Sequence, residues 1–333
     1  MISLFQFFTI LIYASLNLIM LKYLLPYLKK YIISNPNKRD SHIKPKPSGG
    51  GIIFIISILI FLFIDLIILK SNLSIFSLIS LICIPISIIG IFDDIFELKA
   101  LNRYLIQILT VVFLILISKL FNFLYPLQDF SYINIIFLFL TITGATAIIN
   151  FMNFMDGLDG LLGGVMIVIF SYFAIIKFPE LWILVGSLIG FLMLNWSPSK
   201  VFMGDSGSTF LGAIYVGIVL QANDIQQSLE FILISTPLLA DAFSCVIRRF
   251  AKNQNIFTAH KEHLYQRLNQ AGWSHSNVSK LYLFATLVLV IVSYCGNLKL
   301  LISMALLEIL VGIYLDKRIA VNFLSNKNTI SKS

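Results

Sequence analysis

Charged residues are scarce in this chain of 333 residues. They make up 12% of it, whereas 58% of the residues are hydrophobic; an ordinary soluble domain carries about 25% charged residues. This composition excludes a soluble globular protein. It also excludes disorder for nearly the whole chain, because disordered segments need low hydrophobicity. The sequence therefore predicts an integral membrane protein.

Cysteine is scarce as well. Cys83, Cys245 and Cys295 all lie in apolar runs and show neither metal-ligand spacing nor a disulfide framework. We interpret them as small buried side chains. The sequence shows no internal repeat and no low-complexity linker. We therefore expect one integral membrane domain over 1–320, with cytoplasmic active-site loops, followed by a cytoplasmic tail over 321–333.

Apolar runs of the length of a membrane span are abundant. A helix needs about 20 apolar residues to cross the hydrocarbon core. Candidate spans lie near 3–25, 50–69, 74–92, 104–121, 132–150, 161–177, 181–196, 208–221, 228–247, 281–297 and 299–316. The predicted fold is thus an all-α polytopic membrane protein with about eleven transmembrane helices.

Lys and Arg predict the orientation of these spans. Only Lys70, Lys119, Lys177 and Lys299 fall in one set of alternate loops, and most of the remaining Lys and Arg fall in the other set. The basic loops belong in the cytoplasm by the positive-inside rule. This places the N-terminus outside and the C-terminus in the cytoplasm, as an odd number of spans requires. The net charge of +8 then reflects topology and anionic lipid, and not nucleic acid.

The polar motifs gather on the predicted cytoplasmic side. The adjacent carboxylates of Asp93 and Asp94 end the third span, and their repulsion favours a bound cation such as Mg²⁺, although a solvated helix end is the plain alternative. Gly204-Asp205-Ser206-Gly207-Ser208 precedes the eighth span. Its backbone N–H groups at a helix N-terminus would suit a phosphate, and the alternative is a simple tight turn.

Two further clusters are spaced as on helix faces. Asp156 follows Asn153 by three residues and precedes Asp159 by three, and Asn150 extends the series; on a helix these would share one face, as a ligand site or as a polar packing seam. His260, His263 and Arg267 would likewise share a face if helical. They could bind a diphosphate or simply touch lipid headgroups. A zinc site is disfavoured, because no cysteine or third ligand lies beside the two histidines.

The first cytoplasmic loop and the acids at depth leave alternatives open. Lys44 and Lys46 precede three glycines, which together suit an anion site or merely mark orientation and a flexible entry to the next span. Asp241 is a functional candidate by default because it lies within a span. For Asp65 and Glu308 we favour snorkelling or interhelical hydrogen bonds.

Taken in order, these motifs resemble the polyprenyl-phosphate N-acetylhexosamine-1-phosphate transferases of glycosyltransferase family 4. The resemblance covers about 35–275. It is carried by His42 with the glycine loop to 51, Asp93-Asp94, Asn-Phe-Met-Asp-Gly-Leu-Asp-Gly at 153–160, Phe-Met-Gly-Asp-Ser-Gly-Ser at 202–208, Pro-x-x-x-Asp at 237–241, and the His-x-x-His loop. The His-x-x-His loop lacks the run of consecutive histidines that the peptidoglycan translocase carries. In this respect it is similar to the corresponding loop of the O-antigen-initiating branch. Ser48 departs from many members, which leaves the role of the first loop less defined.

The resemblance implies an enzyme of the bacterial inner membrane whose active site faces the cytoplasm. Its substrates would be a UDP-N-acetylhexosamine and undecaprenyl phosphate. The products would be UMP and the first lipid-linked intermediate of a cell-surface polysaccharide, with Mg²⁺, or alternatively Mn²⁺, as cofactor. Asp205 and Asp94 would hold the metal and Asp93 would act beside them; Lys44, Asn150, Asn153, Asp156, Asp159, His260, His263 and Arg267 would bind substrate.

Several alternatives stay open at this stage. A lipid phosphatase or hydrolase would use the same phosphate-binding parts. A secondary transporter is disfavoured, because transporter sites lie near the bilayer midplane, often between repeats. The sequence does not name the sugar or the downstream glycan. It also leaves open a homodimer, and it does not separate direct transfer from a covalent aspartyl-phosphate intermediate.

Overall fold

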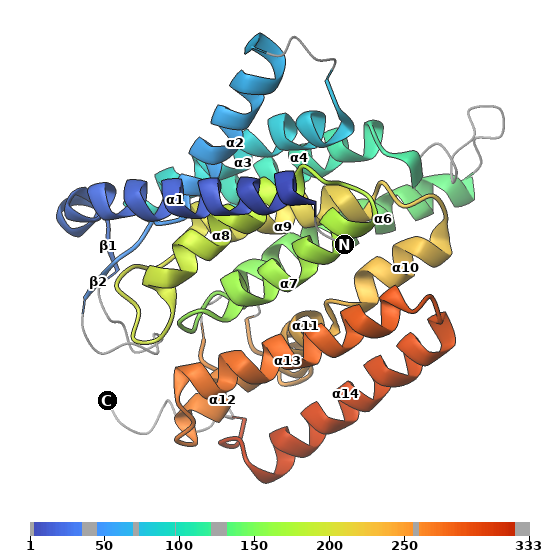
Figure 1. The fold of residues 1–333 in the computed structure, drawn as a ribbon. Coiled ribbons are helices and arrows are strands. Elements are labelled where there is room, and N and C mark those ends of the chain that lie inside the picture. Colours follow the sequence, from blue (N-terminus) through green and yellow to red (C-terminus); the bar gives the residue numbers. More distant parts are fainter. Residues whose placement is uncertain are drawn as a thin grey trace.

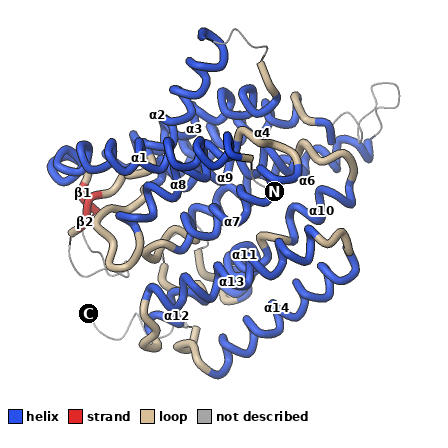
Figure 2. The backbone as a smooth tube through the Cα atoms, in the orientation of Figure 1, coloured by secondary structure: helices blue, strands red, loops and turns tan. Residues whose placement is uncertain are grey.

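Helices account for most of the computed structural model, which describes residues 3–34, 45–68, 73–96, 98–120, 132–255 and 260–323 (Figures 1 and 2). They are α1 Leu4–Tyr31, α2 Ile52–Phe63 with a π-helical turn Ile64–Ile68, α3 Ile75–Phe96, α4 Ala100–Leu116, α6 Tyr132–Phe154, α7 Leu161–Ile176, α8 Leu181–Asn195, α9 Asp205–Val219, α10 Ile225–Leu233, α11 Thr236–Ala251, α12 Leu264–Gln270, α13 His275–Tyr294 and α14 Leu298–Arg318. A two-stranded antiparallel ribbon joins β1 Ile33–Ser34 to β2 Lys46–Pro47.

Five of these helices, α1, α3, α6, α13 and α14, are long and apolar enough to cross a membrane. The pair α10 and α11 passes the same test together, and four shorter apolar helices lie at 52–67, 100–116, 161–176 and 181–195. The chain is therefore a nearly all-α protein with the features of a multi-pass membrane protein. The number of eleven spans and their orientation stay predictions.

The ninth predicted span, 228–247, is not one continuous helix. It is divided between α10 and α11, whose axes differ by 82° across a short break (Figure 1). Pro237 lies in the first turn of α11, where its missing N–H costs nothing. The same residue cannot continue α10, because it offers no N–H to a preceding carbonyl. The expectation that one helix fills 228–247 is wrong for this reason, and whether the bent pair crosses the membrane as one span stays a prediction.

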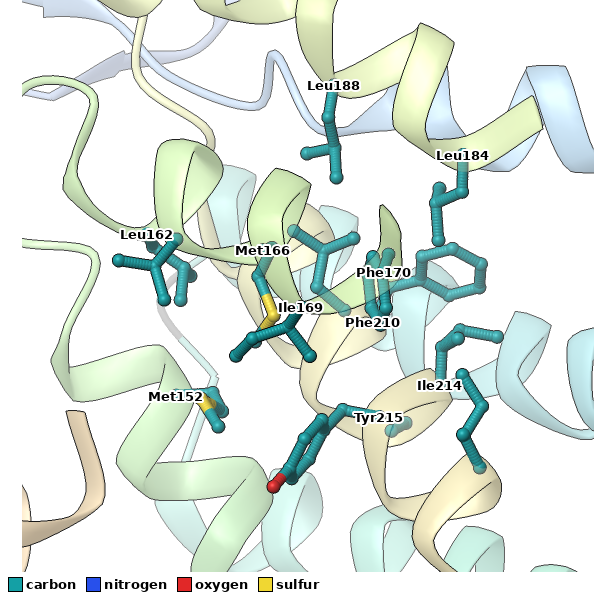
Figure 3. Packing of buried hydrophobic residues seen from close by; sticks show 14 of the residues in the cluster. Met152, Leu162, Met166, Ile169, Phe170, Leu184, Leu188, Phe210, Ile214 and Tyr215 are labelled. Carbon is teal, nitrogen blue, oxygen red and sulfur yellow. The ribbon is translucent and has the colours of Figure 1, made fainter. Parts of the chain in front are cut away.

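The core is centred on α9. Its residues from Ser206 to Val219 are all buried, as expected for a helix surrounded by other helices. In Figure 3, Phe210 and Ile214 of α9 lie among Phe170 of α7 and Leu184 and Leu188 of α8. By contrast, α1 and α14 leave large apolar side chains exposed, among them Phe5, Tyr23, Leu306 and Leu310, which suits helices that face lipid.

Close contact between α1 and α8 depends on two glycines one turn apart. A Cβ atom on Gly190 would lie 2.3 Å from the carbonyl oxygen of Ala14, and one on Gly186 would lie 2.7 Å from that of Ile10. Nearby, the buried amide of Asn17 donates to Ser57 Oγ at 2.7 Å and to Ser187 Oγ at 3.1 Å. Small residues and interhelical hydrogen bonds of this kind stabilise helix packing inside membranes.

Gly190→Ala is therefore expected to destabilise the protein by about 1–3 kcal/mol, because the added methyl group forces α1 away from α8. Gly144→Ala on α6 is the matched control, since a Cβ there meets nothing within 4 Å. Thermal unfolding in detergent, followed by tryptophan fluorescence, measures both. Equal midpoints for the two variants would contradict the packing described here.

Candidate active site

The glycine loop before α2 and the loop between α8 and α9 meet at the beginning of α9. Gly50 N–H donates to the Phe202 carbonyl at 2.9 Å and Gly51 N–H donates to the Met203 carbonyl at 2.8 Å. A Cβ on Gly51 would lie 2.3 Å from Gly207 Cα. The glycines of the first loop thus serve close packing, and an anion site made from the N–H groups of Gly50 and Gly51 is wrong. Lys44, the predicted cation of that site, lies outside the described residues.

Asp94 caps the first turn of α9. Its Oδ1 accepts from Asp205 N–H at 2.9 Å and its Oδ2 accepts from Ser206 N–H at 3.3 Å. Gly204, at a φ of +77°, turns the chain into the helix; a Cβ there would lie 2.4 Å from Asp94 Oδ2. The positive end of the helix is therefore satisfied by a side-chain carboxylate. The expectation that these N–H groups are free for a phosphate is wrong.

Arg103 of α4 joins two carboxylates from different helices. Its Nη1 donates to Asp93 Oδ2 at 2.5 Å and to Asp205 Oδ2 at 2.6 Å. Asp93 Oδ1 also accepts from Leu98 N–H at 2.7 Å, which ties the end of α3 to the following loop. In the sequence, Arg103 stands out only as one of the basic residues that predict the orientation of the spans. Its bridging position depends on the packing of α4 beside α9, which no local pattern reveals.

Asp156 lies near the carboxylates of Asp94 and Asp205, and we call Asp93, Asp94, Asp156 and Asp205 the carboxylate cluster. Burial, reinforced by the neighbouring carboxylates of Asp205 and Asp94, raises the pKa of Asp156 well above its usual value. Among the described residues, Arg103 is the cation that contacts Asp93 and Asp205 in this cluster. Four ionised carboxylates beside one guanidinium would leave an excess of negative charge, and the raised pKa of Asp156 reflects this repulsion. Hard oxygen donors with unbalanced charge fit a divalent cation such as Mg²⁺.

The two predicted asparagines lie at different depths on α6. Asn153 Oδ1 accepts from Ser208 Oγ at 2.7 Å, and so lies against the first turn of α9. Asn150 instead donates to Gln107 Oε1 on α4 at 2.6 Å. Of the two, Asn153 is the one that the structure connects to the helix bearing Asp205.

Asp156 and Asp159 do not share a helix face, because neither is helical. Helix α6 ends at Phe154 and α7 begins at Leu161, with Gly160 in the left-handed region at a φ of +75° between them. The prediction of one carboxylate face is therefore wrong, since the glycines interrupt the helix. The two side chains enter separate networks.

Asp159 is buried in a network of its own. It accepts from Ser199 Oγ at 2.7 Å and from Ser199 N–H at 3.1 Å, with Lys46 Nζ at 3.6 Å and His275 Nδ1 at 3.4 Å. Lys46 also lies over the ring of Phe202. Burial alone would raise the pKa of Asp159, but His275 and Ser199 outweigh it, so this pKa lies below its ordinary value. Asp159 thus links the first loop, the α8–α9 loop and α13.

The lowered pKa of Asp159 gives a pH dependence of stability. Its contribution is complete above the unfolded-state pKa of about 3.9 and is lost as the pH falls through the lower folded value. Wild type is expected to melt above Asp159→Asn at pH 7, and the gap is expected to close below about pH 4. Thermal melts of both proteins across this range make the test, and a gap that stays constant into acid would contradict it.

His260 and His263 lie side by side, but not on a helix. Helix α12 begins only at Leu264, with His263 as its N-cap, so the prediction of one helical face for His260, His263 and Arg267 is wrong. The two imidazole rings stack with centroids 4.9 Å apart. Cys245 Sγ of α11 lies 3.9 Å from His260 Nδ1. The expectation that no cysteine accompanies the histidines is therefore also wrong.

Asp241 holds the histidine loop in place. It accepts from Leu264 N–H at 2.7 Å, Tyr265 N–H at 3.0 Å and Tyr282 Oη at 2.7 Å. Its Oδ1 also lies 3.7 Å from His263 Nδ1. Tyr265 Oη donates to the Phe154 carbonyl at 2.9 Å, which connects the loop to the segment bearing Asp156. Asp241 is thus a positioning residue, which its depth in a predicted span had only marked as a candidate.

Arg267 points toward the end of α14. Its guanidinium pairs with Asp316 and donates to the Val321 carbonyl at 2.9 Å, and its side chain is 4% exposed. In the structure the Arg267 guanidinium is thus occupied by partners within the chain, and its contact with substrate stays a prediction.

Of the two acids in other predicted spans, Asp65 accepts from Ser77 Oγ at 3.4 Å, which is the expected interhelical bond. Glu308 lines an apolar cavity between α11, α13 and α14.

Comparison with known proteins identifies the family. The model of glycosyl transferase family 4 matches residues 75–223. Decaprenyl-phosphate N-acetylglucosaminephosphotransferase of Mycobacterium leprae is 30% identical over 298 residues, which cover 77% of this chain and 75% of that protein. The chain belongs to glycosyl transferase family 4.

Other family 4 relatives differ in the substrate for which they are named. Undecaprenyl-phosphate alpha-N-acetylglucosaminyl 1-phosphate transferase of Salmonella typhi is 27% identical, over 87% of this chain and 81% of that protein. Phospho-N-acetylmuramoyl-pentapeptide-transferase of Staphylococcus saprophyticus is 28% identical, over 79% of this chain and 90% of that protein. The region matched by the family 4 model contains the four clustered carboxylates and ends before the histidine loop.

Proposed function

We propose that this protein transfers N-acetylhexosamine-1-phosphate from a UDP-sugar to undecaprenyl phosphate. An oxygen of the lipid phosphate attacks the sugar-linked β-phosphorus, the bond from that phosphorus to the oxygen bridging it to UMP breaks, and UMP leaves with the electron pair. The observation that carries the proposal is the meeting of Asp93 and Asp205 at Arg103, with Asp94 bound to the N–H of Asp205 and Asp156 nearby. Two anionic substrates meet in such a reaction, so electrostatic control is its main requirement.

Mg²⁺, or Mn²⁺ in its place, is the cofactor that we propose for this cluster. Asp205 and Asp94 would hold it, with Asp156 beside them, because their oxygen donors and unbalanced charge suit a hard divalent cation. When bound, it would supply charge neutralisation for the diphosphate. Asp94 can cap α9 and bind a metal at the same time, because each carboxylate oxygen has more than one lone pair.

The chain's own residues would orient the two substrates, and none of them would need to remove a proton from the lipid phosphate. A phosphate monoester has its second pKa near 6, so the attacking lipid phosphate is largely dianionic at neutral pH and needs no strong base. Arg103 would keep Asp93 and Asp205 at a fixed separation. Asn153 would contribute its amide beside them, since it is already tied to Ser208 of α9.

The donor would lie between the carboxylate cluster and the histidine loop. His260 and His263 would bind the sugar-diphosphate, with Arg267 and Lys44 as further cations, and Asp159 would shape the nucleotide side through Lys46 and Phe202. Tyr265 supports this arrangement, because it joins the histidine loop to the α6–α7 connection.

We place this chemistry at the cytoplasmic face of the bacterial inner membrane. The α6–α7 loop, the α8–α9 loop and α12 lie toward one end of the helices, whereas α10 lies toward the other end (Figure 1). Eleven spans, with the N-terminus outside and the C-terminus inside, would put the motifs in the cytoplasm, where UDP-sugars are made. The lipid tail would lie between spans with its phosphate at the boundary.

N-acetylglucosamine is the sugar to test first, because two of the relatives described above are named for it. The histidine loop lacks consecutive histidines, which favours the initiation of a surface polysaccharide such as O-antigen over a muramoyl-pentapeptide substrate.

A donor panel tests the proposal. The purified protein, undecaprenyl phosphate and Mg²⁺ are combined with each of several UDP-N-acetyl sugars, including a muramoyl-pentapeptide donor, and UMP is measured. We expect UMP from at least one hexosamine donor, and only when lipid and metal are both present. Folded protein that yields no UMP from any donor would overturn the proposal.

A further inference from the structure

Three metal-ligating side chains meet beside the carboxylate cluster but outside it. Cys245 of α11, His260 and His263 place one ligand atom each within 4.8 Å of one another. Among the described residues, they are the His, Cys, Asp and Glu side chains that meet in a group of three with their ligand atoms within this distance. The residues are separated by 15 and three positions along the chain, so the group exists only because the histidine loop folds back onto α11.

The chemistry of these side chains suits a soft or borderline cation. One sulfur and two imidazole nitrogens are the ligands that Zn²⁺ prefers, and hard cations such as Mg²⁺ prefer oxygen. Cys245 Sγ lies 3.9 Å from His260 Nδ1, and the rings of His260 and His263 have their centroids 4.9 Å apart. One sulfur and two imidazoles are thus gathered in one place.

The surroundings resemble the outer shell of a metal site. Asp241 Oδ1 lies 3.7 Å from His263 Nδ1, and a carboxylate behind a histidine commonly orients that ring toward a metal. His263 is 3% exposed and its Nδ1 makes no hydrogen bond with the described residues. His260 is only half-buried, which leaves a route by which a cation can enter.

We propose that Cys245, His260 and His263 form a binding site for a cation of the Zn²⁺ class, separate from the carboxylate cluster. Binding forms one metal–sulfur and two metal–nitrogen bonds. The thiol of Cys245 gives its proton to solvent, and water occupies the remaining position. The three ligand atoms lie within 4.8 Å of one another and would draw closer around the ion, because Zn–N and Zn–S bonds are only about 2.0–2.3 Å long.

An occupied site would inhibit the transferase. This consequence rests on the proposed function, in which His260 and His263 bind the sugar-diphosphate. A cation held by both rings removes them from the donor, so micromolar Zn²⁺ would oppose UMP release even with Mg²⁺ in large excess.

Cobalt absorption tests the site without any activity. The protein is stripped with chelator, and Cys83→Ser with Cys295→Ser leaves Cys245 as the one thiol. Addition of Co²⁺ is expected to give a thiolate-to-cobalt charge-transfer band, which oxygen ligands do not produce. Cys245→Ser is expected to abolish this band. It is also expected to lower the affinity for Zn²⁺ by at least about 100-fold, since loss of an outer-shell group alone lowers metal affinity by 10–100-fold.

His260→Gln is the second variant, in case Cys245→Ser fails to fold, and is expected to weaken Co²⁺ binding comparably. The proposal is overturned if the single-thiol protein gives no charge-transfer band, or if the band persists in folded Cys245→Ser. In the activity arm, Cys245→Ser is expected to keep its UMP release and to lose its sensitivity to Zn²⁺. A band in a protein that releases no UMP from any donor would uphold the metal site and count against the transferase alone.

Discussion

Asp205→Asn is expected to lower UMP release by about 10²–10³-fold while the protein stays folded, because removal of one preorganised electrostatic group commonly costs that much. Asparagine matches aspartate in shape but cannot balance the charge of Arg103 or of a divalent cation. The residual activity is expected to need a higher Mg²⁺ concentration. Initial rates of UMP release across a Mg²⁺ titration measure both effects.

Asp65→Asn is the matched control for this substitution. Asp65 lies away from the cluster and accepts from Ser77 Oγ, and an asparagine carbonyl accepts the same bond. Its activity is expected to stay within roughly twofold of wild type, as for substitutions outside a functional network. Equal activity of Asp205→Asn and wild type would remove Asp205 from the reaction.

Asp241→Asn is expected to raise the KM for the UDP-sugar more than it lowers kcat. The Asp241 carboxylate accepts from two backbone N–H groups at the beginning of α12 and from Tyr282 Oη. An asparagine replaces one oxygen with a donor, so a buried N–H loses its partner at a cost of about 1–3 kcal/mol. The histidine loop should loosen, and hydrogen exchange over 260–267 should rise.

Asp224→Asn provides the comparison. Asp224 is the N-cap of α10 and accepts from Gln227 N–H at 2.7 Å, and asparagine caps helices as well as aspartate does. It should leave KM and exchange in the histidine loop unchanged. If Asp241→Asn behaves in the same way, Asp241 does not position this loop.

The sequence was sufficient to predict the helical class and the set of motifs. Each predicted apolar segment overlaps a helix, because long apolar runs depend little on tertiary context. At 228–247 the sequence did not predict the division into two helices, because the length of the apolar run suggested one helix and Pro237 allows a new helix to begin there. Of the carboxylates that the sequence predicted for the site, Asp93, Asp94 and Asp205 meet at the beginning of α9, and Asp156 lies near them; their roles in the reaction stay predictions.

Side-chain spacing was a poorer guide wherever it assumed a helix. Asp156 and Asp159 lie in a glycine-rich connection, and His260 precedes the first turn of α12, so a three-residue interval did not place side chains on one face. The same limit applied to partners distant in sequence. Arg103 between Asp93 and Asp205, and Cys245 beside His260, depend on helix packing that no local pattern contains.

A double-label experiment tests the central claim most directly. UDP-N-acetylglucosamine carrying one isotope in the β-phosphate and another in uracil is incubated with the protein, undecaprenyl phosphate and Mg²⁺, and the lipid and aqueous phases are counted. If N-acetylglucosamine is the donor sugar, the account predicts β-phosphate label in the lipid phase and an equal amount of uracil label in UMP. Label released as inorganic phosphate, or β-phosphate label that stays with UDP after the sugar has moved to lipid, would contradict sugar-1-phosphate transfer.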